Sequence, residues 1–172
     1  MKFKDSKFGD MTGQTYNGKL DASKLGLTSL EGSPETVIGN FLVYDNNLTS
    51  LEGGPKTVTG SYYCSNNPNL TTLKGAPTSE MADINFEHTG IKNAISEIFD
   101  YGVKARTYYT VTTLYRWRDL ADKYTEYRLN KQIKSKGFKT LLGLKKWRNT
   151  KTYTEIWQEK KLLSRLIVLV MS

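Results

Sequence analysis

The residues best suited to chemistry in this chain are its single cysteine, Cys64, and its single histidine, His88. A thiol beside an imidazole would make a nucleophile with its base, but both side chains must then share one face. Cys64 is expected at a core position of a strand, as a small buried hydrophobe, and His88 in a turn just past Phe86. One cysteine allows no disulfide within the chain and no thiolate metal cluster, and one histidine allows no histidine cluster.

Other catalytic signatures are missing as well. The sequence contains no Walker loop, Rossmann fingerprint or nucleophile elbow, and Gly32, Gly53 and Gly75 are repeat punctuation and not a phosphate cradle. Catalysis by carboxylates has no positive support. We therefore expect a protein that is not an enzyme, with no cofactor and no metal site.

A second group of candidate residues lies in a basic, aromatic segment near the C-terminus. Residues 128–151 hold nine lysines and arginines and no acidic residue, interleaved with aromatic rings. This composition suits phosphate contacts with base stacking, as on single-stranded nucleic acid. A solvated basic face over a small helical core is the other interpretation, and an acidic protein surface is an equally natural partner. The candidate contacts are Arg128, Lys131, Lys134, Lys139, Lys145, Lys146, Trp147 and Arg148.

The net charge of +8 divides unevenly along the chain. Residues 1–90 carry 7 Lys and Arg against 10 Asp and Glu, whereas residues 91–172 carry 18 against 7. Such a split indicates two functional parts, of which the basic part would meet an anionic partner. The N-terminal residues are too charged for a signal peptide, and the apolar run 166–171 is far shorter than the roughly 20 residues that span a bilayer. We expect a soluble, cytoplasmic protein without membrane contact.

A repeat of 21 or 22 residues predicts how the side chains in the first half of the chain are arranged. The segment LTSLEGSP at 27–34 recurs as LTSLEGGP at 48–55 and as LTTLKGAP at 70–77. Between these copies apolar residues alternate, as in Phe41-x-Val43, which predicts a short strand with one buried face. A period in the low twenties is typical of a solenoid, whose stacked turns bury apolar faces that no single turn can bury.

The repeat resembles a known family. Ile38-x-x-Phe41-x-Val43-x-x-Asn46-x-Leu48 is similar, position by position, to the leucine-rich-repeat core LxxLxLxxNxL, and Asn67 marks the next copy. The LTSLEGxP signature looks like the short repeats of many uncharacterised bacteriophage and bacterial proteins. The resemblance covers roughly residues 16–91, and the outer copies lack the asparagine. It implies one strand per turn in a small parallel sheet, and a protein-binding use.

We therefore predict an α/β fold of two parts. Residues 1–91 form a leucine-rich-repeat-like solenoid of about four turns with an N-terminal cap, and residues 92–172 form a basic α-helical region made of a cap and helices. A short helix over 93–99 would close the solenoid. An amphipathic helix is expected between about 105 and 135, and a last helix from about 152 whose end, 167–170, could equally be a strand.

In a leucine-rich array the residues between the core positions of each strand line the concave face. The resemblance thus implies an exposed patch of Leu42, Tyr44 and Tyr63, with Asp21 and Asn85 beside it, unless the C-terminal helices cover it. The leading hypothesis is a non-enzymatic protein-binding module, a phage accessory protein that engages or inhibits a host factor, steered by its basic helices toward an acidic surface. Nucleic-acid binding by the basic helices, or a structural role in a virion, is the alternative.

Overall fold

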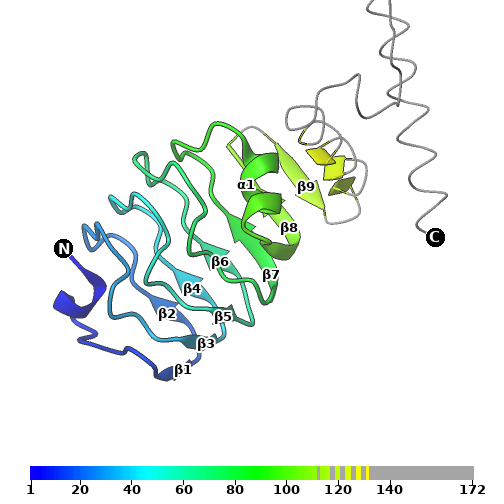
Figure 1. Cartoon of the computed structure of the whole chain (residues 1–172). Coiled ribbons are helices and arrows are strands. Elements are labelled where there is room, and N and C mark those ends of the chain that lie inside the picture. The colour runs from blue at the N-terminus through cyan, green and yellow to red at the C-terminus, as the bar shows by residue number, and fades with distance from the viewer. Residues whose placement is uncertain (112, 117–118, 121–122, 125–126, 129–130, 132–172) are drawn as a thin grey trace, which may run out of the picture. The chain divides into compact units, whose positions relative to one another are not determined.

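The computed structural model describes residues 1–111, 113–116, 119–120, 123–124, 127–128 and 131. Residues Met1–Leu120 make one compact unit, in which the chain winds into a β-solenoid of about five turns (Figure 1). The predicted solenoid is thus confirmed, with one turn more than expected. A second unit spans Ala121–Ser172, and the last predicted helix lies outside the described residues.

The main sheet carries one strand from each turn. Its strands, in spatial order, are β2 (Leu20–Asp21), β4 (Phe41–Leu42), β6 (Tyr62–Tyr63), β7 (Glu80–Asn85), β8 (Lys104–Tyr109) and β9 (Leu114–Arg116). The first five run parallel, and β9 pairs with β8 in the antiparallel direction. The predicted parallel sheet is therefore confirmed, and it continues past residue 91 through β8 and β9.

Each of the first three turns holds a second strand, which the sequence analysis did not predict. These strands, β1 (Thr15–Asn17), β3 (Thr36–Ile38) and β5 (Thr57–Val58), form a separate parallel sheet. A corner separates the two strands of a turn, and the turns stack so closely there that a Cβ at Gly39 would collide with the carbonyl oxygen of Gly18. Gly39 also has a φ of +142°, which only glycine adopts readily.

The corner disappears in the fourth turn. Val58 and Tyr62, the core residues on either side of the third corner, are four positions apart, whereas Met81 and Ile84 are three apart. The fourth turn is one residue shorter here, and it has no glycine at the position of Gly39 and Gly60. As a result, β7 is a single continuous strand of six residues, and β8 pairs along its length.

The core is a set of stacked apolar columns. The main-sheet column has no exposed surface and consists of Leu20, Phe41, Tyr62, Ile84 and Tyr108. The 3-10 helix η1 (Phe3–Asp5) covers the first turn, because the buried ring of Phe3 stacks on Phe8 at 5.4 Å and approaches Phe41 at 6.5 Å between centroids. The apolar side chains of the repeat are therefore buried by stacking between neighbouring turns, as in other solenoids.

The predicted short helix is present as α1 (Ala94–Asp100), with the side chain of Asn93 accepting a hydrogen bond from the Ser96 amide at 3.1 Å. Its expected role as a closing cap is wrong, since α1 connects β7 to β8 and the sheet goes on. Glu97 on this helix accepts hydrogen bonds from the Leu73 amide at 2.7 Å and from the Thr72 hydroxyl at 3.0 Å. The helix thereby satisfies polar groups of the preceding turn.

The helix predicted from about residue 105 is also wrong at its beginning, where β8 and β9 occur instead. Residues 107–113 read TYYTVTT, and β-branched and aromatic residues favour a pleated, half-buried surface. β8 pairs with the open edge of β7, so this part of the chain forms a strand as its residue types favour. Past Leu120 most of that predicted helix lies outside the described residues. No helix in the described part of the chain has the length and hydropathy needed to cross a membrane.

Candidate functional site

The main sheet presents a continuous row of side chains on the face opposite its core column. Because side chains alternate along a strand, the residue next to each core-side residue points the other way: it follows that residue on the parallel strands and precedes it on β9. Strand register places these residues side by side across all six strands. We call them the central row: Asp21, Leu42, Tyr63, Asn85, Tyr109 and Leu114.

A second row runs beside the central row, two residues further along the chain. Backbone hydrogen bonds align its members, from the Lys24 amide to Tyr44 at 3.2 Å, from Asp45 to Ser65 at 3.1 Å and from Asn66 to Glu87 at 3.0 Å. Tyr44 is therefore a neighbour of the central row and not part of it. This flanking row consists of Ser23, Tyr44, Ser65 and Glu87.

The structure brings together all five residues predicted for protein binding, but not all of them as exposed contacts. Tyr44, Tyr63, Asp21 and Asn85 are half-buried, so part of each is open to a partner. Leu42 is only 6% exposed, and its predicted exposure is wrong. It lies in register between Asp21 and Tyr63, where it can pack against its neighbours but offers little surface.

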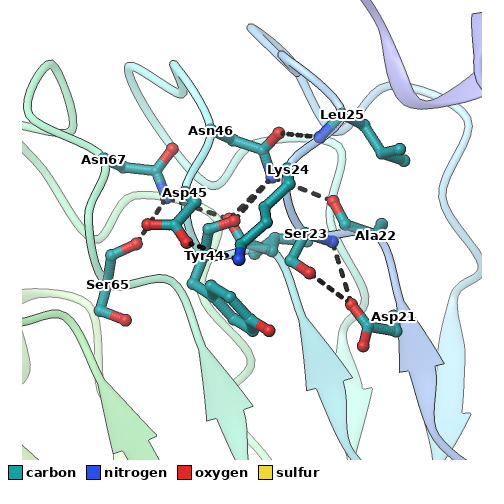
Figure 2. A network of polar contacts seen from close by, with 11 residues as sticks. Asp21, Ala22, Ser23, Lys24, Leu25, Tyr44, Asp45, Asn46, Ser65 and Asn67 are labelled. Atoms are coloured by element: carbon teal, nitrogen blue, oxygen red, sulfur yellow. Dashed lines mark hydrogen bonds and ion pairs between the residues drawn. The ribbon is translucent and has the colours of Figure 1, made fainter.

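Asparagines hold the turns that follow β4 and β6 (Figure 2). The Asn46 side chain accepts a hydrogen bond from the Leu25 amide at 3.1 Å, which Figure 2 shows, and another from the Leu27 amide at 2.9 Å. It also donates to the carbonyls of Ala22 and Val43, both at 3.0 Å. Asn46 thus bonds the backbone where the chain turns, and these bonds tie one turn to the next.

Asn67 repeats this arrangement one turn later. Its side chain donates to the carbonyls of Val43 and Cys64, both at 3.0 Å, and accepts from the Leu48 amide at 3.0 Å. In four successive turns, the residue before this position has a positive φ. These residues are Lys24, Asp45, Asn66 and His88. Asparagine and aspartate tolerate this left-handed conformation better than most residues. The hydrogen-bonded turns at Asn46 and Asn67 therefore hold one side of the face in place.

Cys64 and His88 do not form a catalytic pair. Cys64 has no exposed surface, and burial raises the pKa of its thiol far above the ordinary value. The predicted role of Cys64 as a buried hydrophobe is confirmed. The predicted position of His88 in a turn is confirmed as well, and its φ is positive. No group of histidine, cysteine and carboxylate ligands able to hold a metal ion occurs among the residues that the structure describes.

The acidic residues of the face differ in their partners. Asp21 accepts hydrogen bonds from the Ser23 hydroxyl at 2.6 Å and the Ser23 amide at 3.2 Å, and Lys19 Nζ lies 3.3 Å away. The pKa of Asp21 is lowered, mainly by the Ser23 hydroxyl. Asp83 accepts from the Ser61 hydroxyl and Glu87 from the Asn85 amide group, each at 3.0 Å. These two carboxylates thus have neutral donors.

Tyr109 is a member of the central row that the sequence analysis missed. The reason is that its segment was expected to be helical. A usable signal was present, however, because the Tyr62-Tyr63 pair recurs as Tyr108-Tyr109, and in both pairs the first ring is buried and the second half-buried. A search for that pair, and not for the leucine spacing, would have extended the array.

Of the basic candidates, only Arg128 and Lys131 are described. Arg128 lies over the ring of Tyr124, 5.7 Å from its centroid, and Lys131 over Tyr127 at 5.3 Å. The rings of Tyr124 and Tyr127 stack at 6.5 Å. The others lie outside the described residues: Lys134, Lys139, Lys145, Lys146, Trp147 and Arg148.

The face combines half-buried rings, an amide and carboxylates on one hydrogen-bonded sheet. Comparison with protein-family models, with curated proteins and with solved structures gives no match. Any function proposed for this chain therefore rests on its own residues.

Proposed function

We propose that the chain is a non-enzymatic protein-binding module whose partner docks on the outer face of the main sheet. The observation that carries this proposal is the central row, which crosses six hydrogen-bonded strands and has Tyr63 and Tyr109 half-buried near its middle. Tyrosines are enriched at interfaces, because a rigid ring contributes contact area while its hydroxyl stays hydrogen-bonded. Residues that dominate binding energy cluster near the centre of an interface.

The scaffold supports this use because it holds the face in one shape. Asn46 and Asn67 bond the backbone across neighbouring turns, and strand pairing fixes the spacing of neighbouring residues within each row. A partner then meets side chains that are already ordered, which lowers the entropic cost of association. The buried thiol of Cys64 supports a role other than nucleophilic catalysis.

The finer proposal concerns the setting. The repeats resemble those of uncharacterised phage and bacterial proteins, so we place the chain as a phage accessory protein that engages or inhibits a host factor in the host cytoplasm. Its excess of basic residues after residue 91 would speed association with an acidic region of that factor, since long-range attraction mainly raises the association rate.

The test is capture of partners from bacterial lysate by the tagged full chain, with and without nuclease. We expect one protein to be captured in near-stoichiometric amount whether or not nuclease is added. The double variant Tyr44→Ala, Tyr63→Ala should capture about tenfold less of this protein. Ile38→Ala is the matched control, because Ile38 is an exposed apolar residue on β3, outside the face. Equal capture by both variants would refute the proposal.

Nucleic-acid binding is the second candidate function. It is favoured by the nine basic residues of 128–151 and by the two cations over tyrosine rings, since aromatic and basic side chains together bind single strands. Lys145→Glu with Lys146→Glu should then abolish binding, while Tyr63→Ala does little. A structural role in a virion would instead place the protein in purified particles, where mass spectrometry would detect it.

A further inference from the structure

The fourth turn contributes three polar residues to the face. Asn85 lies in the central row, Asp83 two residues before it and Glu87 two residues after it. At the rise of an extended chain, each lies about 6.6 Å along the strand from Asn85. Pairing continues beyond the end of β7, because the Phe86 amide bonds Tyr109 and the Asn66 amide bonds Glu87.

Two tyrosines close the other sides of this site. Tyr63 and Tyr109 are the register partners of Asn85 on β6 and β8, so they are about 10 Å apart at the usual strand spacing. We call the four residues around Asn85 the cation frame: Tyr63, Asp83, Glu87 and Tyr109. All four are half-buried, which weakens the screening of the two carboxylate charges by water.

The two carboxylates of the frame have no ion pair within the described residues, in contrast to others near the face. Lys19 lies 3.3 Å from Asp21, and Lys24 lies 3.9 Å from Asp45, as Figure 2 shows for the second pair. Asp83 and Glu87 have only the neutral donors Ser61 and Asn85. Arg106 directly precedes Thr107, the register partner of Asp83, but forms no ion pair with Asp83 in the described structure, and Arg116 lies one strand further away. The frame therefore carries two negative charges that no ion pair of the described residues compensates.

Two tyrosine rings and two uncompensated carboxylates suit one class of ligand. A cation is attracted to the faces of aromatic rings, and arginine combines this with planar, paired hydrogen bonds to a carboxylate. We infer that the outer face of the main sheet binds an extended, arginine-bearing segment of the partner protein, with one guanidinium over Asn85 inside the cation frame. This inference rests on the proposed function and adds the chemistry of the partner.

The test uses defined peptides and the full chain. The probe is a fluorescein-labelled peptide, Ser-Thr-Arg-Thr-Arg-Thr-Arg-Thr-Ser, with a matched peptide in which glutamine replaces every arginine. We expect the arginine peptide to bind about tenfold more tightly or better, by fluorescence anisotropy, and to weaken as salt is raised. Equal affinity for the two peptides would overturn the inference.

A pair of charge-matched variants separates the frame from general attraction. Asp83→Asn with Glu87→Gln removes two negative charges while keeping size and shape, and it should reduce affinity for the arginine peptide about tenfold. Glu35→Gln with Glu52→Gln removes the same charge at ion pairs with Lys56 and Lys74, away from the face, and should leave affinity within about twofold. Equal loss in both variants would show non-specific attraction and overturn the inference.

Failure of this inference can be told apart from failure of the proposed function. If Tyr63→Leu with Tyr109→Leu loses the lysate partner and the Asp83→Asn, Glu87→Gln variant retains it, the face binds protein but not through a cation. If neither variant affects capture, the proposed function itself fails. Association of the purified chain with itself, measured by sedimentation and lost in the frame variant, would assign the face to a second copy and overturn the partner assigned here.

Discussion

Two buried tyrosines in the same core column should respond in opposite directions to the same substitution. Tyr108 Oη accepts a hydrogen bond from the Ala105 amide at 2.8 Å and donates to the Val103 carbonyl at 3.1 Å. Tyr62 Oη is buried and has no hydrogen-bond partner among the described residues. Tyr108→Phe therefore takes a hydrogen-bond partner from two backbone groups, whereas Tyr62→Phe removes a hydroxyl that has no partner among the described residues.

The magnitudes follow from the cost of buried polar groups. Leaving a buried donor or acceptor unsatisfied costs about 1–3 kcal/mol, so Tyr108→Phe should lower the free energy of unfolding by about 2 kcal/mol or more. Tyr62→Phe should raise it by about 1 kcal/mol, because the penalty for burying that hydroxyl is removed. The two variants should thus differ by about 3 kcal/mol, although each loses one oxygen atom from the same column.

Urea unfolding followed by far-UV circular dichroism measures this difference. With a slope of about 1.5–2 kcal/mol per molar urea for a domain of this size, the two midpoints should be about 1.5–2 M apart. Unequal slopes would mean that a variant changes more than stability. Equal destabilisation by both substitutions would refute the reasoning, because it would show that the Tyr62 hydroxyl is hydrogen-bonded after all.

The same residue gives a prediction for alkaline pH. Burial raises the pKa of Tyr62 well above its ordinary value near 10. Above about pH 10 the unfolded chain releases this proton and the folded chain does not, so stability is present below pH 10 and falls as the pH rises. Wild-type protein should lose stability more steeply than Tyr62→Phe between pH 10 and 11. Parallel curves would contradict this assignment.

Three further predictions concern the corner, the turn and the thiol. Gly39→Ala should cost about 2 kcal/mol or more, measured by the same urea assay, because its φ of +142° and the nearby Gly18 carbonyl leave no room for a Cβ. Asn67→Ala should cost about 3 kcal/mol through its lost buried hydrogen bonds, whereas the exposed Asn69→Ala should stay within about 0.5 kcal/mol. Cys64 should not react with a thiol reagent at pH 8 until urea unfolds the chain, and rapid reaction of the native protein would show that the core is open.

The repeat made the solenoid predictable, because offsets of 21 and 22 residues are also the offsets between paired strands. The spacing of Leu20, Phe41 and Tyr62 in the sequence is their register in the sheet. Asn46 was identifiable for a local reason, since a side chain that replaces backbone partners works within a few residues of the turn. Repetition and local hydrogen bonding are both written in the order of the residues.

The features that escaped prediction depend on neighbours in space. Leu42 reads as an outward residue, and it is outward, but its burial depends on the side chains in register beside it. Tyr109 lies in a segment whose strand forms against the edge of β7, which no local pattern reveals. The second strands of the second and third turns depend on Gly39 and Gly60, which allow close approach of the preceding turn. In each case tertiary packing decides between conformations that the local sequence allows.

The reversal of direction at β9 ends the parallel ladder of the main sheet. A parallel ladder with a regular period has ends that are copies of each other, so one molecule can serve as a template for the next and a filament results. β9 pairs with β8 in the opposite direction, and this removes the parallel edge that β8 would otherwise offer at that end of the ladder. A second copy at that end would have to pair its β2 with β9 in the antiparallel direction, so the regular parallel ladder does not continue through β9.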